Sequence, residues 1–222
     1  IVPQGALVHS ILRCVPRSRE ADVIIINPND IQPPRINVMN INQGQEAIDK
    51  AIAHMLEGFQ YAMGASWATS VGMQDVLLQG MAMVKSIDPD VSMCELEAFL
   101  DLVSAAGKDN DEKRKKELFE YSKLPLHVAG QRALNYWRKE FVALNPNSRA
   151  QAAGAAKRRV KAFLNSDEIR STMGMKGSTV NLEEAINSGK LILVVMAEGM
   201  GEIDRKIWGT LLVREFISIL KR

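Results

Sequence analysis

One run of basic side chains is the part of the sequence best suited to binding an anionic partner. The stretch "AAKRRVKAF" carries Lys157, Arg158, Arg159 and Lys161. On a helix, the first, second and fourth of these lie on the face away from Val160 and Phe163. A stripe of this kind can contact the phosphates of a nucleic acid. A solvated helix face that binds nothing is the more common meaning of such a run, so both interpretations stay open.

A second basic run lies earlier in the chain and is a weaker candidate for DNA contact. The stretch "DEKRKKE" supplies Lys113, Arg114, Lys115 and Lys116. Acidic residues flank it on both sides, which favours a solvated helix face over a phosphate site. We keep Lys113 and Arg114 as DNA-binding candidates behind the first run.

Arg170 is the one candidate for a catalytic role. It lies in "SDEIRSTMG", near the end of a short helix and close to Gly174. An arginine so placed can act in trans on a nucleotide held by a neighbouring subunit. A cation that complements the dipole of its own helix terminus is the alternative.

Other familiar kinds of chemistry have no readable pattern in this sequence. Cys14 and Cys94 are far apart, and the three histidines pair with no cysteine or second histidine at ligand spacing, so no zinc site is predicted. The glycine-containing stretch "AEGMGEIDRK" lacks the Gly-Lys-Ser/Thr of a P-loop and is read as a plain turn. No Ser/His/Asp or Cys/His set is recognisable. We therefore expect no cofactor and no metal in this chain.

Composition points to a helical protein without a strong bulk charge. The 222 residues carry a formal charge of +2, with 46% hydrophobic and 5% aromatic residues and 11 methionines. A methionine-rich, aromatic-poor core suits packed helices. The near balance of charge means that any nucleic-acid site must be local. No run of 18 apolar residues occurs, and the cysteine usage suits a reducing compartment, so a cytoplasmic location is expected.

Two short apolar runs predict strands at the two ends of the chain. "DVIIIN" near residues 22–27 and "KLILVVMAEG" near 190–196 are typical of buried parallel strands. The segment between them is helical in pattern, with about six helices from Gln45 to Leu164, whose apolar contacts are expected to include Leu77, Met81 and Val128. Ser92 with Glu95 predicts a capping box, and Asn181 or Thr179 caps a later helix.

These elements predict a mostly α protein with α/β flanks. We divide it into an α/β part at 1–42, an all-α insertion at 43–165 and a return to α/β at 166–222. The boundary near Asn42 follows a proline- and asparagine-rich loop. The first residues, Ile1 and Val2, look like a strand end, so we expect the chain to be a piece of a longer protein.

Several segments, in order, resemble the HerA-like ATPases of the TraG/TraD type, the coupling proteins that pump DNA in bacterial conjugation. They are "PQGALVHSILRCVPRSREADVIIINPND", "RINVMN", "YWRKEFVAL", "AKRRVKAFLNSDEIRSTMG", "STVNLEEAINSGKLILVVMAEG" and "WGTLLVREF". The resemblance spans nearly the whole chain. No single segment is diagnostic, and the resemblance depends on all of these segments occurring in the family's order.

The resemblance implies a partial RecA-like α/β core interrupted by an all-helical insertion that contacts DNA. The full-length protein would be a homo-hexamer that uses ATP and Mg²⁺, at the inner face of the membrane through segments outside this chain. Relaxase or relaxosome proteins and secretion-channel proteins would be its partners. The Walker A and Walker B segments lie outside these residues in the family pattern, so this chain alone is expected to be inactive.

The sequence departs from the family pattern beside the expected nucleotide site. The family's first turn reads acid-Pro-His-Gly-acid, whereas Val2, Gln4 and Ala6 stand here in place of the first acid, the histidine and the second acid. Asn27 replaces the aspartate of an Asp-Pro pair. These changes remove charge and favour the alternatives of a divergent or degenerate motor, or of a member with a different partner. A non-catalytic helical module that recruits a protein is a separate alternative.

Overall fold

The two apolar runs form strands that pair with each other although most of the chain lies between them. In the computed structural model, which describes residues 5–39, 45–64, 71–105, 108–196 and 200–220, β1 is Val23–Ile26 and β2 is Leu191–Val194. They are parallel, with Val23 opposite Leu191 and Ile26 opposite Val194. The prediction of parallel strands near 22–27 and 190–196 is confirmed.

This small sheet is less buried than its sequence predicts. Ile26 and Val194 are fully buried, but the other side chains of both strands are half-buried or exposed, and Ile25 is 37% exposed. Parallel strands normally lie beneath helices on both faces. Among the described residues the sheet has two strands, so neither strand has a second neighbour. The prediction of fully buried strands is wrong for this reason.

Helices lead into and out of the sheet. α1 is Gly5–Arg13, and the 3-10 helix η1, Arg17–Asp22, leads directly into β1. After the helical segment come α10 (Asp167–Met173), α11 (Leu182–Asn187) and α12 (Glu202–Leu220). Arg19 donates to the Gly189 carbonyl at 2.6 Å, and Lys190 pairs with Asp22 at 2.8 Å. These contacts hold the starts of the two strands together.

The predicted all-α segment is helical throughout its described length. Its elements are α2 (Gln45–Met63), α4 (Val71–Ile87), α5 (Met93–Ser104), α6 (Lys108–Tyr121), α7 (Val128–Asn135), the π-helical turn η2 (Tyr136–Glu140), α8 (Phe141–Ala143) and α9 (Pro146–Leu164). No strand lies between β1 and β2 in the described ranges. α7, η2 and α8 form one continuous rod, which agrees with the prediction of about six helices.

The helix termini follow the capping residues read from the sequence. The Ser92 hydroxyl accepts from the Cys94 amide, and the Ser92 amide donates to the Glu95 carboxylate at 2.9 Å, completing the predicted capping box. Asn181 caps α11, so it rather than Thr179 begins that helix. Asn145 caps α9, which has Pro146 at its first position.

One predicted contact in the α7 rod is wrong. Val128, expected to face the core, is 59% exposed, while Ala129, Gly130 and Ala133 are buried instead. Gly130 lies so close to α4 that an added Cβ would stand 2.4 Å from the Ser86 Cβ. The helices approach through small residues here, so the largest apolar side chain of this turn is on the outside.

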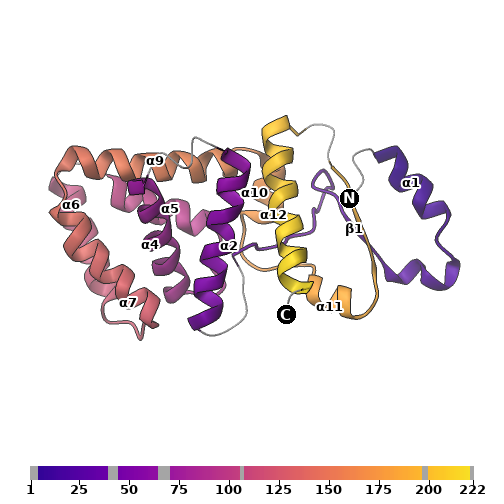
Figure 1. Ribbon diagram of the computed structural model, residues 1–222, viewed down its shortest axis with the longest axis horizontal. Coiled ribbons are helices and arrows are strands. Elements are labelled where there is room, and N and C mark those ends of the chain that lie inside the picture. The colour runs from indigo at the N-terminus through magenta and orange to yellow at the C-terminus, as the bar shows by residue number, and fades with distance from the viewer. Residues whose placement is uncertain (1–4, 40–44, 65–70, 106–107, 197–199, 221–222) are drawn as a thin grey trace.

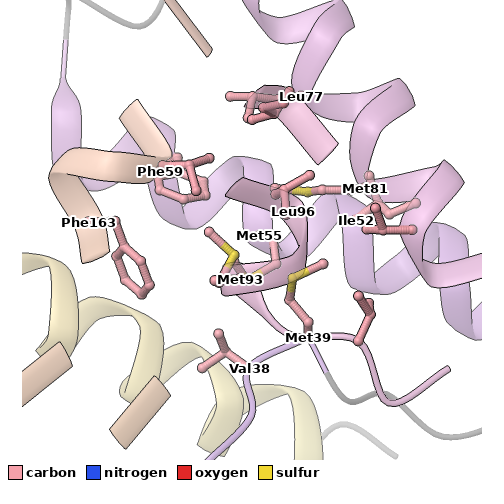
Figure 2. Close-up of a cluster of buried hydrophobic side chains, with 14 of the residues drawn as sticks. Val38, Met39, Ile52, Met55, Phe59, Leu77, Met81, Met93, Leu96 and Phe163 are labelled. Atoms are coloured by element: carbon pink, nitrogen blue, oxygen red, sulfur yellow. The ribbon is translucent and has the colours of Figure 1, made fainter. Parts of the chain in front are cut away.

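One continuous core runs from the helical segment to the sheet. Figure 2 shows Val38 and Met39, from the loop after β1, beside Met55 of α2 and Met93 of α5. α12 packs against α2, and the two lie side by side in the middle of the elongated molecule (Figure 1). The predicted boundary near Asn42 lies outside the described residues, as do Ile1, Val2 and Gln4. The division into three parts stays a prediction.

Candidate nucleic-acid interface

α9 carries the main basic run, and its opposite face fixes the orientation of that run. Ala153, Ala156, Val160 and Phe163 are fully buried, and this side of α9 packs on α4 and α5. Small alanines let α9 approach these helices closely. The outward side therefore carries the exposed Arg158 and Lys161, as the sequence predicts.

Two of the four basic residues of this run are exposed to solvent. Arg158 and Lys161 are exposed and make no ion pair among the described residues. Lys157 is half-buried and pairs with Asp101 of α5 at 2.5 Å. Arg159 is half-buried on the other flank and interacts within the chain. We call Arg158 and Lys161 the α9 basic face.

The α6 run offers even less positive charge to a partner. Arg114 is only 3% exposed, because it shares the inward face of α6 with Leu118, one turn away. A buried guanidinium is not placed to meet a phosphate, so Arg114 leaves the set of surface candidates. Lys115 pairs with Glu112 at 2.8 Å. Lys113 is exposed and lies at the rim of a cavity.

Arg170 is exposed, and its guanidinium makes contacts within its own chain. Its Nε donates to the Leu164 carbonyl at 3.1 Å, at the end of α9, and its Nη2 lies 3.4 Å from the Glu97 carboxylate. The guanidinium thus complements the C-terminal dipole of α9. The alternative predicted from the sequence is that it complements the terminus of its own helix.

Asn27, directly after β1, forms a local turn in which its side chain accepts from the Asn29 amide and donates to Asp30.

A cavity of about 410 Å³ lies beneath α6, against α4 and α5. Its apolar surface comes from Val84, Ile87, Val91, Phe99, Leu102 and the ring of Tyr121. Its polar rim is formed by Asp88, Glu95, Lys113, Glu117 and Lys176. Burial and the neighbouring Glu117 carboxylate raise the pKa of the Tyr121 hydroxyl. We call this space the α6 cavity; periodicity could not reveal it, because three helices form it.

A second cavity of about 520 Å³ lies between α11, α12 and the loop after β1. Its charged lining is acidic, from Glu183, Glu184 and Glu215. This lining would repel phosphate, so the cavity is no part of a nucleic-acid interface.

Lys85 is the most unusual charged residue and was missed by sequence reasoning. It is 1% exposed at the end of α4, where its ammonium donates to the Pro89 carbonyl at 2.7 Å and to the Met39 carbonyl. Burial lowers its pKa to about 8, against the opposing effect of Asp90 and Asp88. The lysine ties the loop after β1 to the α4–α5 turn.

The described residues contain no group of three or more His, Cys, Asp or Glu side chains arranged to hold a metal ion. None of the described helices is both long enough and apolar enough to cross a membrane. The glycine-containing turn at 197–199 lies outside the described ranges.

No protein-family model, no curated protein and no solved structure matches the chain.

Proposed function

We propose that the chain is the central segment of a DNA-translocating ATPase of the conjugative coupling type. The observation that carries this proposal is the half-exposed, two-stranded parallel sheet. Two apolar parallel strands, half-exposed and without second neighbours among the described residues, are joined by a long helical segment. Such strands are expected to continue into a larger, helix-covered α/β core, which a RecA-like domain would supply.

In this proposal the helical segment meets DNA through the α9 basic face. Arg158 and Lys161 are exposed, point away from the core and have no acidic partner in the described structure. ATP and Mg²⁺ belong to the full-length protein by resemblance. The hexamer, the relaxosome and the secretion channel as partners follow from the same resemblance.

The proposal is tested by measuring DNA binding by the chain over a range of salt concentrations. Phosphate contacts make the logarithm of affinity fall linearly with the logarithm of salt, by about 0.9 per contact on duplex DNA. Arg158→Ala/Lys161→Ala should reduce this slope by about two and weaken binding at low salt. Arg138→Ala/Lys139→Ala removes the same charge from exposed positions of η2 and serves as the matched control. Equal slopes for the two double variants would contradict a role for the α9 basic face.

A second candidate function is recruitment of a protein by a non-catalytic helical module. Its supporting observation is that three of the six candidate cations are engaged within the chain or buried, namely Lys157, Arg159 and Arg114. The α6 cavity, in addition, is lined by apolar side chains that a partner protein could cover. Absence of DNA binding at low salt would favour recruitment over DNA contact.

A further inference from the structure

Three side chains of α6 face the α6 cavity at intervals of one helical turn. Lys113, Glu117 and Tyr121 all line it, and they are spaced four residues apart. Successive members of such a row lie about 6 Å apart along the helix axis. None of the three has an ion pair or a side-chain hydrogen bond within the described part of the chain. One wall of the cavity thus presents a cation, an anion and a hydroxyl in a fixed order.

The opposite wall has already satisfied its charges. Lys176 pairs with Asp88 at 2.5 Å and lies 3.9 Å from Glu95. Glu95 also belongs to the capping box of α5. The charges that remain for a partner are therefore those of Lys113 and Glu117.

The floor between these walls is apolar and already ordered. Val84, Val91 and Phe99 are buried, and the Phe99 ring lies 6.4 Å from the Tyr121 ring, centroid to centroid. An occupant that covered this floor would remove half-exposed apolar surface of Ile87 and Leu102 from water, which favours binding.

We propose that the α6 cavity is a docking site for an amphipathic helix of a partner protein. The apolar side chains of the partner helix would pack on the floor of the cavity. An acidic side chain of that helix would pair with Lys113, and a basic side chain one turn away would pair with Glu117. A helix presents opposite charges at this spacing beside an apolar stripe, so it matches both walls at once. Nucleic acid does not match, because Glu117 opposes phosphate and the rim carries three carboxylates against two ammonium groups.

This inference rests on the recruitment candidate and names its surface. It does not depend on the α9 basic face, which lies on a different helix. Salt-dependent DNA binding and peptide binding are separate measurements, so either can fail without the other.

The test uses a capped helical peptide with a leucine stripe and, beside it, a glutamate and a lysine one turn apart. Binding to the whole chain is followed by fluorescence anisotropy of the labelled peptide. Lys113→Glu alone and Glu117→Lys alone should each weaken binding about tenfold, because one attraction becomes a repulsion. Lys113→Glu/Glu117→Lys should recover most of the affinity, because the peptide can then bind in the opposite direction.

Two further variants distinguish binding at this site from nonspecific binding of the peptide. Ala98→Trp, at an exposed position on the cavity rim, should fill the space and abolish binding while the melting temperature is retained. Lys116→Glu places the same charge change on the outer surface of α6 and should leave binding unchanged. Absence of peptide binding to the unaltered chain overturns the proposal. So do single reversals without effect, or a double reversal that fails to recover affinity.

Discussion

At the scale of single residues, Lys85 shows how a charge can be buried to join two parts of a chain. Its ammonium reaches the carbonyls of Pro89 and Met39, which belong to different loops. A buried ammonium remains tolerable only when it is hydrogen-bonded or neutral. The lowered pKa, about 8, reflects the cost of keeping the charged form away from water.

Stability should therefore depend on pH through Lys85. Its folded-state pKa is below that of an unfolded lysine, so between about pH 8 and pH 10 the unfolded chain binds more protons. The free energy of unfolding should rise with pH across this window, by on the order of 1–3 kcal/mol. Burial also raises the pKa of the Cys94 thiol, which opposes this rise within the window, and the raised pKa of Tyr136, about 12, opposes it above about pH 10.

Urea unfolding of the native chain and of Lys85→Met, measured at several pH values in the window, checks this prediction. The rise should vanish in Lys85→Met, whatever its stability at pH 7. Lys206→Met removes an exposed lysine from α12 and should keep the rise. An unchanged pH dependence in Lys85→Met would rule out this residue as its origin.

At the scale of elements, the close approach of α7 to α4 depends on a glycine. A Cβ added at Gly130 would lie 2.4 Å from the Ser86 Cβ, far inside van der Waals contact. Gly130→Ala should therefore destabilise the chain by about 1–3 kcal/mol, because two helices must separate.

Gly72 of α4 supplies the matched control. A Cβ there would lie 3.7 Å from Ala152, an ordinary contact. Gly72→Ala should be neutral or stabilise the chain by up to about 1 kcal/mol through helix propensity. Thermal melts followed by circular dichroism compare the two variants. Equal melting temperatures would contradict the prediction, because they would show that α7 can shift away from α4 without loss of stability.

Local features of the helices could be predicted from sequence, whereas contacts between helices could not. The capping box at Ser92 and the apolar stripe at Leu77 and Met81 depend on spacing within one element, and both are present. The burial of Arg114 and the exposure of Val128 depend on which neighbour each helix meets. The α6 cavity and the tie made by Lys85 arise for the same reason, because each joins segments distant in sequence.

At the scale of the whole molecule, the chain should not hydrolyse ATP by itself. Its 222 residues contain no G-x-x-x-x-G-K-[ST] sequence, the motif whose backbone amides hold the phosphates in P-loop enzymes. A phosphate-release assay with ATP and Mg²⁺ should match the protein-free background, with and without DNA. Turnover that follows the protein through purification would overturn this prediction.

The pairing of β1 with β2 also has a consequence for how the chain folds. Val23 meets Leu191 only after everything between them has been synthesised. Closing so long a loop as an open coil is entropically costly and slow, whereas prior folding of the intervening helices shortens the search. Folding of the helical segment should thus set the rate at which the sheet forms. On the ribosome, the three isoleucines of β1 cannot pair with β2 until residues 191–194 have emerged.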